Sequence, residues 1–270
     1  MTFPASTRWR PPLLVRLSIG LHLIAVSLVL IDPAAWASAL AIVVADHLLI
    51  AAVGLWPRST WLGSNWNRLP SAARERNEIS LTIDDGPDPE VTPQVLEILD
   101  RYQVKASFFC IAERAAHYPE LCREIVKRGH DVENHTQHHR HNFSLLGSQG
   151  YRREIEAAQA VLSALAGSEP QFFRAPAGLR NPFLDPVLHR LNLQLASWSV
   201  RGYDTRVRDA NRVKNNLLRG LRPGAILLLH DGNGARTSDG IPVILAVLPQ
   251  LLEAAAAARL RFIRLRDAKY

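Results

Sequence analysis

The chain has 270 residues, of which 47% are hydrophobic and 21% are charged. These fractions exclude an intrinsically disordered chain, and the length suffices for one large α/β domain with an additional segment. The formal net charge is +7, and much of the excess is arginine flanking an apolar N-terminus, so we expect membrane lipid as the anionic partner. The chain carries neither a recognition-helix signature nor an aromatic RNA-binding signature, so we expect no nucleic-acid partner.

Two apolar stretches open the chain. The first covers residues 12–31 and is interrupted by Arg16 and His22, and the second covers about 34–56. Each has about the 20 residues that cross a hydrocarbon core, which predicts an N-terminal transmembrane helical hairpin. A cleavable signal peptide is the alternative, because residues 37–39 (Ala-Ser-Ala) resemble a cleavage site, but the second stretch argues against cleavage.

The side of the membrane follows from the basic residues. They flank both ends of the hairpin and are absent from its loop, so the positive-inside rule predicts a bacterial-type inner membrane with the rest of the chain facing the cytoplasm. The periplasmic side is the alternative. Asp46 and His47 weaken the second span, which could instead lie in the interface or pack on the first helix. The arginines concerned are Arg8, Arg10, Arg58, Arg68, Arg74 and Arg76.

Beyond the hairpin, short apolar segments alternate with amphipathic ones. The short segments are bounded by turn residues and predict strands, and the longer segments between them predict helices. This alternation is typical of parallel strands with crossover helices, so we expect an α/β fold, a distorted (β/α) barrel of about seven parallel strands preceded by the hairpin. The predicted strands are 79–84, 106–111, 131–134, 171–174, 193–197, 225–229 and 261–265, and the predicted helices are 92–102, 118–128, 150–166, 186–191, 210–221 and 241–258. The chain then divides into an anchor (1–56), a linker (57–77) and a catalytic domain (78–270).

The first predicted strand ends on two adjacent carboxylates, Asp84 and Asp85, followed by Gly86 and Pro87. Paired carboxylates at the end of a buried strand are costly unless a cation or hydrogen bonds neutralise them. In barrel-like α/β folds the active site gathers at the C-terminal ends of the strands. A metal beside these carboxylates is therefore one interpretation, and a solvated Asp-Asp-Gly-Pro turn is the other.

Four histidines follow the third predicted strand within seven residues. Among them, His135 and His139 have the four-residue spacing that places two imidazoles on one face of a helical turn. With Asp85 they would form a two-histidine, one-carboxylate set that leaves positions open for water, as catalytic zinc or iron sites require. An exposed polar loop is the alternative, and we expect His138 and His141 to be structural or exposed.

Two further polar residues end predicted strands. Arg174 emerges from an apolar run and requires an anionic partner, unless it is a surface arginine on an edge strand. His230 ends the apolar run 226–229 and falls at the same edge of the predicted sheet, although a lone histidine there could also be structural.

In order and spacing, these segments resemble the motifs of the polysaccharide deacetylase family, carbohydrate esterase family 4. Residues 82–87 (Thr-Ile-Asp-Asp-Gly-Pro) are similar to its first motif, Thr-Phe-Asp-Asp-Gly-Pro. Residues 135–139 (His-Thr-Gln-His-His) resemble the second, and residues 174–178 (Arg-Ala-Pro-Ala-Gly) resemble the third, Arg-x-Pro-aromatic-Gly. Residues 228–230 (Leu-Leu-His) resemble the fifth, Leu-x-His, and the similarity extends over about 78–265.

The resemblance implies a role for each site residue. Asp84 would be the general base, Arg174 would orient it, and His230 would be the general acid. The Ala177 N–H would help to form an oxyanion hole, and Leu228 would line a pocket for the acetyl methyl group. The three ligand candidates would bind a divalent metal, which in this family is most often zinc.

The chain departs from the family motifs at three positions. Ala177 replaces an aromatic residue that contacts sugar, and Arg140 stands where proline commonly follows the second motif. Arg201 replaces the first aspartate of the fourth motif, Asp-x-x-Asp-Trp, which would pair with Arg174. Two facing arginines without a partner would be unfavourable. We therefore infer that Asp204 pairs with Arg174 instead, or that Arg201 binds an anionic group of the substrate.

The resemblance implies a metal-dependent hydrolase that removes an acetyl group from an N-acetylated amino sugar in a polysaccharide, oligosaccharide or glycolipid. The first alternative is a deformylase or deacylase of a lipid-linked sugar at the inner membrane. The second is a non-catalytic carbohydrate-binding membrane protein. The hairpin favours a substrate presented at the membrane, and the presence of base, acid and ligand candidates argues against the non-catalytic alternative.

Overall fold

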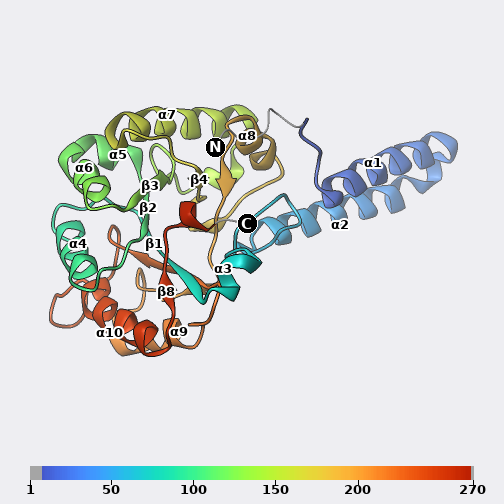
Figure 1. Ribbon diagram of the computed structural model, residues 1–270. Coiled ribbons are helices and arrows are strands. Elements are labelled where there is room, and N and C mark those ends of the chain that lie inside the picture. The colour runs from blue at the N-terminus through green and yellow to red at the C-terminus, as the bar shows by residue number, and fades with distance from the viewer. Residues whose placement is uncertain (1–7, 269–270) are drawn as a thin grey trace.

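The computed structural model describes residues 8–268. The first seven residues of the predicted anchor and the last two of the predicted catalytic domain lie outside this range. Within it, a helical hairpin projects from an α/β domain, and its tip points away from that domain (Figure 1).

The centre of the domain is a curled, half-barrel sheet of parallel strands, with the strand order β5-β4-β3-β2-β1-β7-β6. An additional strand, β8, pairs with the beginning of β1. This arrangement confirms the predicted α/β fold with about seven parallel strands. The strands are β1 (Glu78–Asp84), β2 (Ser107–Cys110), β3 (Asp131–Asn134), β4 (Phe172–Phe173), β5 (Gln194–Leu195), β6 (Val200–Arg201), β7 (Ile226–His230) and β8 (Arg261–Phe262).

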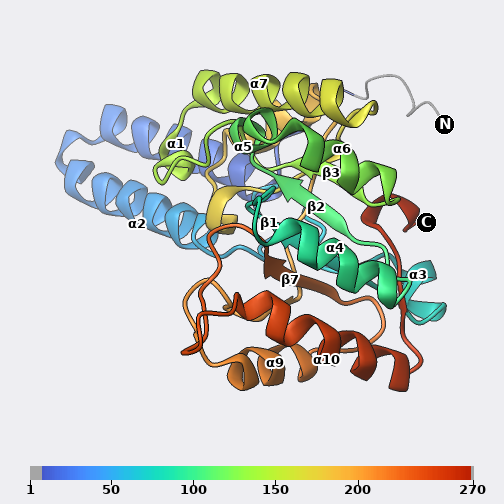
Figure 2. The same cartoon turned by 90° about the vertical axis from the view of Figure 1, so that its left-hand side faces the viewer.

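Helices cover the outside of the sheet, with α7 on one side and α9 and α10 on the other in Figure 2. Apolar side chains from the strands and helices form the large core between them. The helices of the domain are α3 (Ser71–Glu75), α4 (Thr92–Arg101), α5 (Ala112–His117), α6 (Pro119–Lys127), α7 (Ser148–Ala166), α8 (Leu184–Arg190), α9 (Ala210–Leu218) and α10 (Val243–Ala257). Short 3-10 turns are η1 (Pro33–Ala35), η2 (Phe143–Leu145), η3 (Pro176–Gly178) and η4 (Leu265–Asp267).

The central strand β1 is completely buried and separates two chemical environments. Ile79, Leu81 and Ile83 belong to the core beneath the helices. Because side chains alternate along a strand, the residues between them face the interior of the half-barrel. There the hydroxyl of Thr82 donates to the carbonyl of Leu227 on β7 at 2.7 Å. The strand therefore brings a polar side to the place where its C-terminal end begins the candidate site.

The hairpin consists of α1 (Leu13–Ile31) and α2 (Trp36–Gly54), joined by η1. Both helices are long and apolar enough to cross a membrane, and most of their surface is exposed. They pack against each other and, at the base, against the domain: the indole of Trp9 donates to Asp185 at 2.7 Å. A membrane hairpin and a signal sequence would both fit these helices.

Residues 57–77, for which the sequence predicts a linker, pack closely on the domain. Leu62 is 1% exposed and Leu69 is 3% exposed. The amide of Trp66 donates to the carbonyl of Leu195 at 2.8 Å, and Ser197 donates back to the Trp66 carbonyl at 3.0 Å. This segment therefore lines the edge of the sheet at β5.

These contacts predict that Leu62→Ala destabilises the whole domain by about 2–5 kcal/mol, because a buried leucine is lost and a cavity remains. The free energy of unfolding of the full chain in detergent, from denaturant titration, measures the effect. The matched control is Leu145→Ala, since Leu145 is 82% exposed and should cost less than about 0.5 kcal/mol. Equal stability of the two variants would mean that residues 57–77 are a loose connection.

Candidate active site

The predicted site residues converge at the C-terminal edge of the sheet. Asp84 and His230 end the neighbouring strands β1 and β7 and are in register with each other. His135 follows β3, and Arg174 follows β4. Because all these strands are parallel, their C-terminal ends meet at one edge. A cavity of about 490 Å³ opens there, and its lining includes Ala177, Leu228 and the three ligand candidates.

Asp85 lies between the two histidines that the sequence pairs with it. Its Oδ1 atom is 3.2 Å from Nε2 of His135 and 3.3 Å from Nε2 of His139. This Oδ1 atom is buried and accepts no hydrogen bond from the residues that the structure describes. A buried carboxylate oxygen without a donor, facing two imidazole nitrogens, fits a divalent cation with further positions open for water and substrate. The two-histidine, one-carboxylate set is therefore present as predicted.

Neighbouring groups fix the orientation of these ligands. Nδ1 of His135 lies 2.8 Å from the carbonyl of Arg174. A carbonyl can only accept, so Nδ1 carries the proton and Nε2 keeps its lone pair for a metal. The amide of Asn233 donates to Oδ2 of Asp85 at 3.2 Å, and Arg114 donates to the Asp85 carbonyl at 2.8 Å. These bonds leave Oδ1 as the oxygen that faces the imidazoles.

The electrostatics favour the protonation states that metal ligands require. Burial alone would raise the pKa of Asp85, but the imidazoles of His135, His230 and His139 lower it below the ordinary value. Burial, together with the proximity of His135, lowers the pKa of His139 to about 4. Asp85 is therefore ionised and His139 is neutral near pH 7, which suits both for binding a cation.

The backbone around the ligands adopts uncommon conformations. Five residues at the site other than glycine have positive φ angles, where most side chains are disfavoured. They are Asp85 (76°), Thr136 (69°), His139 (49°), Ala177 (54°) and Asn233 (52°). Such residues persist only where the surrounding structure holds them, and they cluster at functional sites.

Arg174 is buried in the interior of the half-barrel and holds Asp84 in place. Its Nη1 atom donates to Oδ1 of Asp84 at 2.5 Å and to the hydroxyl of Thr82 at 2.9 Å. The other donors of the guanidinium bind the carbonyls of Ala196 and Ser197. With Oδ1 occupied, Oδ2 of Asp84 remains available, 4.0 Å from Nε2 of His135. The geometry therefore directs one free carboxylate oxygen towards the ligand cluster.

Asp204 pairs with His230 rather than with Arg174. Oδ1 of Asp204 is 3.0 Å from Nδ1 of His230, and Oδ2 accepts from the His230 amide at 2.7 Å. The predicted pairing of Asp204 with Arg174 is therefore wrong, because the guanidinium is already satisfied by Asp84, Thr82 and two carbonyls. Burial alone would lower the pKa of His230, but the Asp204 carboxylate raises it to about 9.

Arg201 lines the cavity without a carboxylate partner among residues 8–268. Its guanidinium carbon lies 5.3 Å from the ring centre of Trp198 and 5.4 Å from that of Tyr203. Its Nε atom is buried and makes no hydrogen bond within the described range. The two aromatic rings therefore contact the Arg201 guanidinium by cation–π interactions, which leave its N–H donors without an acceptor among the described residues. Of the two inferences made from the sequence, an anionic substrate group is the one that this geometry leaves open.

Several residues of the site have no clear signal in the sequence. Arg114 lies on α5, which follows β2 directly and was not among the predicted helices. Asn233 follows His230 by three residues, and that proximity is the only hint of its contact with Asp85. Asp231 is also buried, and its Oδ2 accepts a hydrogen bond from Thr92 at 2.6 Å. A methyl group at the neighbouring Gly86 would collide with the Asp231 carboxylate.

The two remaining histidines of the cluster behave as expected. His138 lies 3.0 Å from Glu154 through Nδ1, and about half of its side chain is exposed. His141 is exposed at the rim of the cavity. Neither belongs to the ligand set.

The chain is similar to known deacetylases. The family model for polysaccharide deacetylase matches residues 71–196. A peptidoglycan-N-acetylglucosamine deacetylase of Bacillus cereus is 32% identical over 200 residues, which cover 73% of this chain and 71% of the relative. A chitooligosaccharide deacetylase of Bradyrhizobium sp. is 36% identical over 154 residues, 57% of this chain and 70% of the relative. A solved peptidoglycan N-acetylglucosamine deacetylase superposes with a TM-score of 0.68 at 28% identity, covering 76% and 92% of the two chains.

The Asp204–His230 contact predicts that Asp204→Asn lowers the pKa of His230 by more than one unit, towards or below the ordinary value of about 6.5. The asparagine keeps the shape but removes the charge that raises the pKa, and the effect of burial remains. The imidazolium then loses its proton at a lower pH. Titration of the labelled imidazole by NMR measures the shift. The control is Asp209→Asn, which affects only the N-cap of α9 and should leave the titration of His230 unchanged.

Proposed function

We propose a reaction for this chain on one premise: the chain belongs to the polysaccharide deacetylase family, whose members are hydrolases. The reaction is removal of the acetyl group from an N-acetylated amino sugar, of the N-acetylglucosamine type on which its relatives act. One observation carries the proposal. Asp85, His135 and His139 converge in the same cavity as a free oxygen of Asp84 and the imidazole of His230.

We propose that Asp85, His135 and His139 hold a divalent cation, most simply Zn²⁺. Two imidazole nitrogens and one carboxylate oxygen form a donor set that zinc accepts while leaving positions open. When bound, such an ion would polarise the acetyl carbonyl and make a neighbouring water molecule more acidic.

The residues of the chain then perform the proton transfers. Oδ2 of Asp84 accepts the proton of the attacking water, while Arg174 holds Oδ1 and thereby fixes the direction of the free oxygen. The oxygen of that water adds to the acetyl carbon, and the Ala177 N–H donates to the negative charge that develops on the carbonyl oxygen. Leu228 provides the apolar wall for the methyl group.

His230 completes the reaction as the acid. It is protonated at neutral pH because Asp204 raises its pKa to about 9. As the carbon–nitrogen bond breaks, the imidazolium gives its proton to the leaving amine. The products are acetate and a glycan with a free amino group.

We propose that residues 1–56 anchor the enzyme in a membrane and that 57–77 connect the anchor to the catalytic domain, 78–270. A cavity of about 1130 Å³ lies at the base of the hairpin, and its largely apolar lining includes Leu13, Leu17, Arg8 and Arg10. Apolar and basic side chains together suit a lipid-linked substrate with an anionic group, and this supports a substrate presented at the membrane. This cavity and the unpaired Arg201 favour a second candidate, deacylation or deformylation of a lipid-linked sugar. The arginine distribution continues to predict the cytoplasmic side, where a lipid-linked precursor would be available.

The proposed base predicts that Asp84→Asn reduces deacetylation of chitooligosaccharides by at least about 10²–10⁴-fold, because the amide cannot accept the proton. Metal content should remain that of the wild type, since residue 84 is not a ligand. Acetate release and metal analysis of the same preparations measure both effects. His135→Ala, as the matched ligand variant, should lose the metal of the catalytic site and the activity with it. Wild-type turnover by Asp84→Asn would show that another group is the base.

The unpaired guanidinium predicts a preference for substrates with a phosphate or carboxylate next to the acetylated sugar. Arg201→Gln should reduce kcat/KM on such a substrate by about 10–100-fold, the equivalent of one charged hydrogen bond of about 1.5–3 kcal/mol. On a neutral chitooligosaccharide the change should be small. Arg219→Gln, at the exposed end of α9, serves as the control. An equal loss on both substrates would mean that Arg201 supports the site and does not select the substrate.

A further inference from the structure

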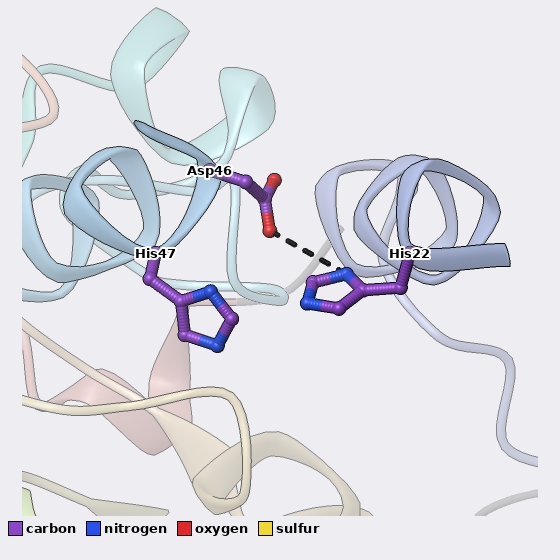
Figure 3. Close-up of side chains that lie close together, drawn as sticks. All are labelled: His22, Asp46 and His47. Carbon is purple, nitrogen blue, oxygen red and sulfur yellow. Dashed lines mark ion pairs between the residues drawn. The ribbon is translucent and has the colours of Figure 1, made fainter. Parts of the chain in front are cut away.

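Three polar side chains meet where the two helices of the hairpin lie side by side (Figure 3). None of them lines the catalytic cavity. His22 belongs to α1, and Asp46 and His47 belong to α2. His22 follows the first residue of α1 by nine positions, and Asp46 follows the first residue of α2 by ten, so both lie about 15 Å from those ends. In a bilayer of about 30 Å hydrocarbon thickness, this is the depth at which polar groups are most costly.

The carboxylate of Asp46 links the two helices. It is 8% exposed, and its Oδ2 atom accepts a hydrogen bond from the hydroxyl of Ser18 on α1 at 2.6 Å. The same oxygen lies 3.9 Å from Nδ1 of His22, the contact marked by the dashed line in Figure 3. The rings of His22 and His47 approach edge to face, with their centres 5.1 Å apart.

Both histidines are held in the tautomer that a metal ligand needs. Nδ1 of His22 is 2.8 Å from the carbonyl of Ser18, and Nδ1 of His47 is 2.9 Å from the carbonyl of Val43. Because a carbonyl can only accept, each Nδ1 carries its proton and each Nε2 keeps a lone pair when the ring is neutral. His135 in the catalytic cavity is oriented by the same kind of contact, an Nδ1–H group that donates to a backbone carbonyl.

We propose that His22, Asp46 and His47 bind a divalent transition-metal ion, most suitably Zn²⁺, at a site separate from the catalytic one. One potential ligand atom from each residue lies within 4.8 Å of the others, as in the catalytic set. The donors are again two imidazole nitrogens and one carboxylate oxygen, which zinc accepts with a fourth position open.

The surroundings favour a cation at this place. An ionised aspartate in the middle of a membrane helix costs about 2.5–3.5 kcal/mol on insertion scales, and a bound cation would offset that charge. Ligands on both α1 and α2 would also join the two helices beyond the single Ser18–Asp46 hydrogen bond. His47 is exposed, so this side of the cluster faces outward from the helix pair, where a group of another molecule could approach.

The test counts zinc ions in the full-length protein, purified in detergent without a histidine tag, stripped with a chelator and reloaded. We expect two zinc ions per chain in the wild type, from elemental analysis. His135→Ala/His139→Ala, which lacks the catalytic ligands, should retain one, and His22→Leu/His47→Leu should also retain one. The proposal is overturned if the catalytic double variant binds none, or if the hairpin double variant still binds two.

Three controls separate ligand loss from misfolding or unspecific binding. Ser18→Ala removes the hydrogen bond to Asp46 but no ligand, and should keep two ions. His117→Leu removes an exposed histidine outside both sites and should also keep two. The hairpin double variant should retain wild-type helix content by circular dichroism together with its one catalytic ion. In cobalt-loaded His135→Ala/His139→Ala, visible absorption from nitrogen and oxygen ligation should disappear when His22 and His47 are also replaced.

Discussion

The guanidinium of Arg174, buried inside the half-barrel, is the contact on which the arrangement of the site depends. Its donors join β1 to the chain after β5 through Asp84, Thr82 and the carbonyls of Ala196 and Ser197. Its own carbonyl accepts from His135, so one residue positions both a carboxylate and an imidazole. Removing one partner of a buried ion pair costs about 3–5 kcal/mol, because the other charge stays uncompensated. The fold and the chemistry therefore rely on the same side chain.

Two pairs of oppositely charged side chains lie on either side of the ligand cluster. On one side Arg174 occupies one oxygen of Asp84 and leaves the other free, and on the other side Asp204 keeps His230 protonated. The first pair fixes the direction of a free carboxylate oxygen, and the second keeps an imidazole protonated near neutral pH. The cation site between them needs an ionised Asp85 and a neutral His139, and the surroundings favour both states.

Much of this arrangement could be predicted from the sequence, because polar residues that end apolar strands must meet at one edge of a parallel sheet. Asp84, His135, Arg174 and His230 are such residues. The partners of these groups could not be predicted in the same way. One of the two alternatives paired Asp204 with Arg174, although the family resemblance already implied that Arg174 orients Asp84. Nothing in the sequence indicated that Asp204 contacts His230 instead.

Short elements were the other source of error. The helix α5 has six residues and the strand β6 has two, too few for a periodic pattern to emerge. The contact of Arg114 with the site was hidden for that reason, whereas Arg201 was found through the family resemblance and not through a strand pattern. In the hairpin, the sequence offered packing of the second apolar stretch on the first helix as an alternative to a span. The structure shows a Ser18–Asp46 hydrogen bond between the two helices.

Residues 57–77 pack on the sheet edge at β5, and this packing limits how far the active site can lie from the end of the hairpin. Pro57 lies against Gly178, next to Ala177 in the catalytic cavity, only three residues beyond the end of α2. With the hairpin in a bilayer, residues 57–77 would not act as a flexible linker that lets the catalytic domain move away from the membrane. The active site would stay within a thin layer at the lipid surface and would meet substrate by lateral diffusion of the enzyme in the membrane. Glycans outside that layer would not be deacetylated, even if they carry acetyl groups.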